Sequence, residues 1–128
     1  MEKDQKQYKC FRDLKVWIKS FNTACEIFEI TKTFPKEEKY ALIDQIRRAT
    51  RSVSANIAEA WYKRSYPKSF ICKLIDASGE SGEVEVWLDF SLSHNYLTKE
   101  KYDYLLSKYT DIGKMLNSMI NNPEKFCH

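Results

Sequence analysis

Between residues 42 and 61, large apolar side chains recur at steps of three and four residues, and this pattern constrains the fold most. They are Leu42, Ile43, Ile46, Ala49, Val53, Ile57 and Trp61. This spacing places them on one stripe of a helix, which is stable only when it packs against another apolar surface. We expect the helix to begin in the turn at Pro35, with Glu37 and Glu38 near the positive end of its dipole, and to end at Trp61 or Tyr62. The chain must therefore fold further helices around this one.

Three other stretches show the same periodicity. Residues 12–31 have a stripe formed by Leu14, Trp17, Ile18, Phe21, Ala24, Cys25, Phe28 and Thr31. Residues 67–92 have a stripe formed by Phe70, Ile71, Leu74, Ala77, Ser78, Ser81, Val84, Leu88, Ser91 and Leu92. After an expected N-cap at Thr98, the last stripe is Tyr102, Leu105, Leu106, Tyr109, Ile112, Leu116, Met119 and Ile120. Each pattern predicts an amphipathic helix.

Three glycines and three prolines are few for 128 residues, and the prolines lie between the periodic stretches. Long helices joined by short connections are therefore favoured over strands and turns. The sequence predicts an all-α chain folded as an antiparallel up-down-up-down four-helix bundle. We assign residues 1–11 to a polar lead-in, 12–122 to a single bundle domain and 123–128 to a C-terminal tail.

Cysteines and histidines give no sign of a metal site. Four cysteines are widely spaced without a C-x-x-C pair: Cys10, Cys25, Cys72 and Cys127. Because Cys25 falls on an apolar stripe, we expect reduced thiols in a cytoplasmic protein. The two histidines, His94 and His128, stand at no ligand spacing, so no metal or cofactor is expected. No apolar run approaches the roughly 18 residues of a membrane span, and no catalytic motif is present, so we predict a protein that is not an enzyme and binds no membrane.

Charge is uneven along the chain, because residues 1–68 carry 15 basic and 9 acidic side chains, whereas residues 69–128 carry 6 and 9. A polar cluster beside the stripe of residues 42–61 consists of Arg47, Arg48, Arg51, Asn56 and Glu59. In one interpretation, Asp44 pairs with Arg47 or Arg48, and the arginines meet acidic residues of the stretch 67–92, within or between subunits. Those acidic residues are Glu80, Glu83 and Glu85. In the other interpretation, the guanidinium groups bind nucleic-acid phosphates.

Aromatic and basic residues are interleaved in the connection that follows Trp61. They are Tyr62, Lys63, Arg64, Tyr66 and Lys68. Single-stranded nucleic acid binds such mixtures, because bases stack on rings while cations contact the backbone. Alternatively, the cations complement the helix dipole and the rings cover the end of the bundle.

The middle of the stretch 67–92 is built from small residues, since 77–82 reads Ala-Ser-Gly-Glu-Ser-Gly. Each glycine costs about 1 kcal/mol relative to alanine in a helix, so the segment is either a site of tight packing, which we favour, or a flexible point. The contacts that we expect within the bundle or between subunits involve Arg47, Arg48, Glu59, Ser78, Gly79, Glu80, Gly82 and Glu83.

Four ordered motifs resemble those of a known family: FRDLKVW at residues 11–17, FPKEE at 34–38, QIRRA at 45–49 and NIAE at 56–59. Over residues 11–120 the chain resembles the four-helix bundle proteins encoded in 23S rRNA intervening sequences, also called S23 ribosomal proteins. The resemblance implies a ring-like homo-oligomer of five subunits, a homopentamer. A related branch, the accessory variability proteins of diversity-generating retroelements, binds nucleic acid and the reverse transcriptase.

These observations lead to two hypotheses. The first is a non-catalytic oligomer that binds RNA or other single-stranded nucleic acid. Its backbone contacts are Arg47, Arg48, Arg51, Lys63, Arg64 and Lys68, with Tyr62 and Tyr66 as stacking residues. The alternative is an oligomeric scaffold or protein-interaction module with no nucleic-acid role, in which the basic half binds an acidic partner protein or the acidic stretch 67–92.

Overall fold

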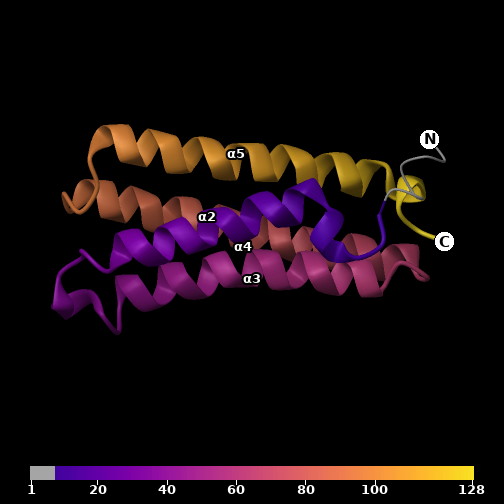
Figure 1. The fold of residues 1–128 in the computed structure, drawn as a ribbon, viewed down its shortest axis with the longest axis horizontal. Helices are drawn as coiled ribbons and strands as arrows, with labels where there is room; N and C mark the ends of the chain where they lie inside the picture. The colour runs from indigo at the N-terminus through magenta and orange to yellow at the C-terminus, as the bar shows by residue number, and fades with distance from the viewer. Residues whose placement is uncertain (1–7) are drawn as a thin grey trace.

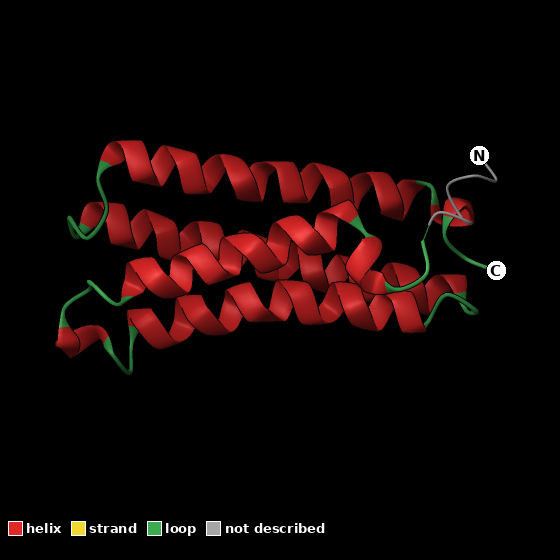
Figure 2. Cartoon of the chain, in the orientation of Figure 1, coloured by secondary structure: helices red, strands yellow, loops and turns green. Residues whose placement is uncertain are grey.

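The computed structural model describes residues 8–128, and within that range the chain is all-α (Figures 1 and 2). Four long helices make up most of it: α2 (Lys15–Thr31), α3 (Leu42–Tyr62), α4 (Pro67–Ser93) and α5 (Lys99–Asn121). Three short 3-10 turns accompany them: η1 (Phe11–Asp13), η2 (Lys36–Glu38) and η3 (Pro123–Lys125). No strand occurs in the described range, in agreement with the predicted fold class.

The helices lie side by side along the long axis of the molecule (Figure 1). Both α2 and α4 contact α3 and α5, but α2 does not contact α4, so these two helices stand at diagonal corners of the bundle. The connection between α3 and α4 lies at the same end as the C-terminus (Figure 1). The outward faces of α2 and α4 therefore point to different sides of the molecule.

The predicted stripe of the central helix is confirmed, because all seven of its apolar residues are buried in α3. The stripes of α4 and α5 are confirmed in their main members, since Phe70, Leu74, Val84 and Leu88 are buried, as are the α5 residues at matching spacing. The buried residues of α5 are Leu105, Tyr109, Ile112, Leu116 and Met119. Together they form one apolar core along the axis of the bundle.

The start of the central helix differs from the prediction. The turn after Pro35 is the separate 3-10 turn η2, and α3 begins at Leu42. Between them Ala41 has a non-helical backbone (φ −123°, ψ −104°), which separates the two elements. Glu38 still serves the helix start, because its Oε1 accepts a hydrogen bond from the Leu42 N–H at 3.2 Å. Its other oxygen accepts from the Tyr96 hydroxyl at 2.8 Å, and this bond raises the Tyr96 pKa.

The apolar stripe predicted for residues 12–31 is wrong in its central part. The buried residues of α2 are Val16, Ser20, Thr23, Ile27 and Thr31. Ile18, Phe21 and Cys25 are instead exposed. The small hydroxyl residues can face the core because they donate to carbonyl oxygens of their own helix, Ser20 to Trp17 at 2.9 Å and Thr23 to Lys19 at 2.7 Å. Helix α2 therefore buries Val16 and Ile27 but leaves Ile18 and Phe21 on the surface.

The glycines of α4 are not sites of tight packing within the chain. Gly79 and Gly82 are exposed, and a Cβ atom at either position would meet no neighbouring atom within 4 Å. The helix also continues without interruption from Pro67 to Ser93, so no break in it supports the alternative of a flexible point. Ser78 is exposed beside them, whereas Ala77 and Ser81 are buried. The small residues of α4 thus form two groups, one in the core and one on the surface.

The connection from α4 to α5 is held by local backbone geometry. Asn95 has φ 63°, the left-handed conformation that commonly ends a helix. The Tyr96 N–H then donates to the Ser91 carbonyl at 2.8 Å, which closes the last turn. As predicted, Thr98 caps α5, because its hydroxyl accepts from the Lys101 N–H at 3.1 Å.

Aromatic rings from both ends of the chain close one end of the bundle. Phe70 at the start of α4 stacks on Phe126 with ring centroids 6.1 Å apart, and Phe126 stacks on Tyr8 at 5.7 Å. Phe70 is buried, whereas Tyr8 and Phe126 are half-buried. Tyr8, before η1, and Phe126, after α5, therefore pack on the core.

One buried polar group suggests a stabilising substitution. Tyr109 of α5 is fully buried, and its hydroxyl has no hydrogen-bond partner among the described residues. Burial, with a smaller contribution from the Glu26 carboxylate, raises the Tyr109 pKa well above its usual value. An unpaired buried hydroxyl costs about 1–3 kcal/mol.

Tyr109→Phe is therefore expected to raise the free energy of unfolding by about 1 kcal/mol, because it removes the unpaired oxygen and keeps the ring. Urea denaturation followed by circular dichroism measures the change. Tyr104→Phe is the matched control, because the Tyr104 hydroxyl donates to Glu26 at 2.9 Å and its removal should not stabilise the protein. A loss of stability in Tyr109→Phe would show that the hydroxyl has a partner in solution.

Candidate functional site

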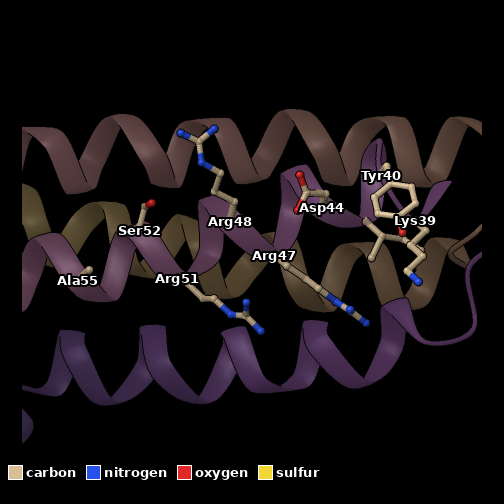
Figure 3. A pocket seen from close by; sticks show the side chains of 9 residues that line it. Lys39, Tyr40, Asp44, Arg47, Arg48, Arg51, Ser52 and Ala55 are labelled. Carbon is tan, nitrogen blue, oxygen red and sulfur yellow. The ribbon is translucent and has the colours of Figure 1, made fainter.

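A basic concave feature lies on the outer side of α3 (Figure 3). We call it the arginine hollow; it has a volume of about 600 Å³. Its lining residues are Lys39, Tyr40, Ile43, Asp44, Arg47, Arg48, Arg51, Ser52 and Ala55. Arg47 and Arg51 point toward α2, whereas Arg48 points to the other side of α3 (Figure 3). Helical spacing thus gathers all three predicted arginines, and the fold adds Lys39, which the sequence reasoning did not select.

Arg47 has a structural role that the sequence did not reveal. Its Nε donates to Thr31 Oγ1 at 2.9 Å, and its Nη2 donates to the Phe28 carbonyl at 3.1 Å. The guanidinium also lies 4.3 Å from the centre of the Phe28 ring. Phe28 and Thr31 belong to the last turn of α2, where carbonyl groups lack helical partners and a cation is favoured. Arg47 therefore fastens α3 to the C-terminal end of α2.

Arg48 and Arg51 form no salt bridge with any residue of the range 8–128, and neither does Arg47. The predicted pairing of Asp44 with Arg47 or Arg48 is absent from the salt bridges of that range. The same holds for pairing of the arginines with the acidic residues of α4 within one chain. Arg51 lies 5.7 Å from the Phe28 ring, on the same ring as Arg47. Two exposed guanidinium groups, Arg48 and Arg51, thus remain without a carboxylate partner inside the described bundle.

The other two members of the predicted polar cluster lie on the α4 side of α3. Glu59 Oε1 forms a salt bridge with Lys73 Nζ of α4 at 2.7 Å. Asn56 Oδ1 accepts from the same ammonium group at 3.5 Å, and Asn56 Nδ2 donates to the Ser52 carbonyl at 2.9 Å. The bond to Glu59 raises the Lys73 pKa. These residues connect α3 to α4 and are separate from the arginine hollow.

The aromatic and basic residues after Trp61 lie at the end of the bundle where α3 passes into α4. Tyr62 and Tyr66 are strongly exposed, 75% and 71% respectively, and Lys63 and Lys68 are exposed beside them. Arg64 differs, because it is half-buried, lies 3.5 Å over the Trp61 ring and donates to the Trp61 carbonyl at 2.8 Å. Burial lowers the Arg64 pKa somewhat from its high normal value. Arg64 therefore binds the C-terminal end of α3, which is the role that the alternative interpretation gave to the cations, whereas the Tyr62 and Tyr66 rings do not cover the bundle end.

Two residues from η1 extend this exposed surface. The Phe11 ring meets the Tyr62 ring edge-on at 6.1 Å, and the Arg12 guanidinium lies 4.4 Å over Phe11. The sequence reasoning did not select either residue as a site, although both belong to the FRDLKVW motif at residues 11–17. We call the surface formed by Arg12, Tyr62, Lys63, Tyr66 and Lys68 the end patch.

No group of three or more histidine, cysteine or acidic side chains within residues 8–128 is arranged to hold a metal ion. All four cysteines are free thiols. No helix in the described part of the chain combines the length and apolar character needed to cross a membrane.

Similarity to known proteins identifies the family of the chain. The family model described as 23S rRNA-intervening sequence protein matches residues 12–118. The chain belongs to this family. A solved structure that resembles it is a protein of unknown function from the S23 ribosomal protein family of Bacteroides thetaiotaomicron. The two are 36% identical, the match covers 83% of this chain and 95% of that one, and the TM-score is 0.75. No curated protein matches the chain.

Both candidate surfaces of this 23S rRNA-intervening sequence protein lie inside the matched range. The arginine hollow and the end patch fall between residues 12 and 118. The family match therefore includes both surfaces as well as the fold. The similar solved structure is of unknown function, so the function of this chain is inferred from the residues of the two surfaces.

Proposed function

We propose that this chain is a non-catalytic, homo-oligomeric protein that binds single-stranded nucleic acid, preferably RNA, through the end patch. The observation that carries the proposal is the exposure of two tyrosine rings among cations that form no salt bridge within the described bundle. Bases stack on such rings, at about 1–3 kcal/mol per base, while the cations contact phosphates. The 23S rRNA intervening-sequence origin of the family makes RNA the first ligand to test.

The start of α4 adds a second reason to expect an anion at this end. The helix begins with Pro67, and its N-cap residue Tyr66 makes no side-chain capping bond. The first N–H groups of α4 and its positive dipole end thus face the surface without an acidic side chain in the first turn. Lys68 places a further positive charge at this position, which is unfavourable unless an anion binds nearby. A backbone phosphate would supply that anion.

Oligomerisation would bring several copies of this weak binding site together. The up-down-up-down bundle and its ring-like assembly, with five copies as the expected number, are parts of the same proposal. In a ring every copy has an equivalent end patch, so one strand can contact several patches and bind more tightly than a single patch allows. The proposed location is the cytoplasm.

A labelled single strand from an rRNA intervening sequence, an unrelated RNA strand and the matching DNA test this proposal by fluorescence anisotropy at low and physiological salt. Wild-type protein is expected to bind, with affinity falling steeply as salt rises. Changing Lys63 and Lys68 to alanine should reduce the slope of log K against log salt by about 0.7 for each phosphate that the variant no longer neutralises.

Lys99 and Lys101 provide the charge-matched control, because they are exposed at the start of α5, at the opposite end of the molecule. Their double alanine variant should bind as the wild type does. Tyr66→Ala should weaken binding without changing the salt slope. If the wild type fails to bind at low salt, or if both double variants behave alike, the scaffold function replaces nucleic-acid binding. That alternative is favoured by the exposed apolar faces described next.

A further inference from the structure

Helix α4 carries a second apolar stripe, on the side turned away from its own core. Its members follow steps of three and four residues: Cys72, Ile75, Gly79, Gly82, Val86 and Phe90. All six are exposed, including Ile75 at 52% and Phe90 at 47%. We call this the α4 outer face. A helix that is apolar on two sides is normally buried on both, so the second side requires a partner outside the bundle.

Negative charge surrounds the α4 outer face. Between Asp76 and Asp89 the helix has five carboxylates and no basic residue. Glu80 and Glu85 have no hydrogen bond or salt bridge within the described range, although Glu83 accepts from Trp87 at 3.2 Å. Two α4 outer faces would therefore repel each other. The matching surface must be apolar in the middle and basic at its edge.

Such a surface exists between α2 and α3. This α2–α3 groove, with a volume of about 520 Å³, is lined by Phe21, Ala24, Cys25, Phe28, Glu29, Arg51 and Ser54. Arg51 also lines the arginine hollow, so the groove and the hollow adjoin. The surface thus combines an apolar floor with Arg51, an exposed arginine that has no carboxylate partner within the described bundle.

Nucleic acid would explain Arg51 and leave the apolar floor unexplained. One face of each ring in the groove is already used, because Trp17 stacks on Phe21 at 4.9 Å and Arg47 lies over Phe28 at 4.3 Å. Stacked bases would have to compete with these contacts. An apolar helix with acidic flanks satisfies both the floor and the edge, and this chain supplies one in α4.

We propose that the α4 outer face of one copy packs into the α2–α3 groove of the next, with Arg51 meeting the acidic residues beside Gly79 and Gly82. The two glycines lack side chains, so the neighbouring helix can approach α4 closely. This inference deepens the assembly part of the proposed function and does not depend on nucleic-acid binding.

The position of the two surfaces determines the type of assembly. Because α2 and α4 stand at diagonal corners, each copy presents the groove on one side and the α4 outer face on another. The contact is therefore heterologous: every copy uses one surface toward each neighbour. Heterologous contacts generate a closed ring or an open filament, and do not produce a two-fold dimer.

Mass measurement by light scattering after size exclusion tests the proposal with three surface variants. Phe21→Glu disables the groove, Val86→Glu disables the α4 outer face, and Tyr104→Glu is the control at an exposed aromatic of α5. Circular dichroism and thermal melting establish that each variant is folded. We expect the wild type and the control to be oligomers of fixed mass, and each of the other two variants to be a monomer of 15.2 kDa.

The decisive sample is an equal mixture of the Phe21→Glu and Val86→Glu proteins. Each retains the surface that the other lacks, so the mixture should form dimers of twice 15.2 kDa and stop there. If the wild type is an oligomer and either variant keeps the wild-type mass, these surfaces are not the interface, although assembly itself stands. A monomeric wild type would reject both assembly and this interface. Two monomeric variants that stay monomeric when mixed would show that the surfaces do not pair.

Discussion

Phe70→Ala is expected to lower the free energy of unfolding by about 3–5 kcal/mol, the range for removing a buried aromatic ring. Phe70 is 1% exposed at the start of α4 and stacks on Phe126, which in turn stacks on Tyr8. Removal of its ring leaves a cavity in the core and also removes the surface that holds both terminal segments. The loss is measured by urea denaturation at a fixed protein concentration, because the stability of an oligomer depends on concentration.

Phe126→Ala is the graded control for this substitution. It deletes the same ring from the same stack, but Phe126 is half-buried, so the cost should be about 1–2 kcal/mol. Limited proteolysis should then release the C-terminal residues in both variants. Equal costs for the two substitutions would contradict the view that Phe70 belongs to the core and Phe126 covers it.

Arg47→Ala is expected to cost about 2–4 kcal/mol, an unusually large effect for an arginine at the surface of a helical bundle. The estimate combines charged hydrogen bonds, at about 1.5–3 kcal/mol, with a cation–π contact of about 0.5–1 kcal/mol. The Phe28 carbonyl would lose its charged donor and keep only the Thr31 hydroxyl at 3.0 Å, and the last turn of α2 would lose the cation near its negative end. Urea denaturation measures this loss.

Two further variants separate the geometry of Arg47 from its charge. Arg47→Lys keeps the charge but cannot reproduce the planar fork that contacts Thr31, Phe28 and the Phe28 ring, so an intermediate loss is expected. Arg48→Ala removes an exposed arginine one residue away and should stay within about 0.5 kcal/mol of the wild type when the proteins are monomeric. If Arg47→Ala costs no more than Arg48→Ala, the contacts to α2 do not stabilise the fold.

The amino-acid sequence by itself determined the number of long helices, while the three 3-10 turns were not predicted. Steps of three and four residues located all four helices, and the buried residues of α3 agree with the pattern completely. Local residue signals located the starts of two helices, because Pro67 occupies the first turn of α4 and Thr98 caps α5. These features are local, since they depend on backbone geometry and hydrogen bonds within a few residues. Local structure of this kind can therefore be derived from the amino-acid sequence.

Tertiary structure alone decided which side of α2 turns to the core. In α2, Ser20 and Thr23 are buried while Ile18 and Phe21 are exposed. Hydrophobicity along one helix does not reveal this, because internal bonds let a hydroxyl face the core and because a second partner can cover the larger side chains. Arg47 shows the same limit, since its partners Phe28 and Thr31 stand 19 and 16 residues earlier in the chain. Which groups meet across helices depends on how the helices rotate and pack against one another. This arrangement depends on the packing of all the helices in the bundle.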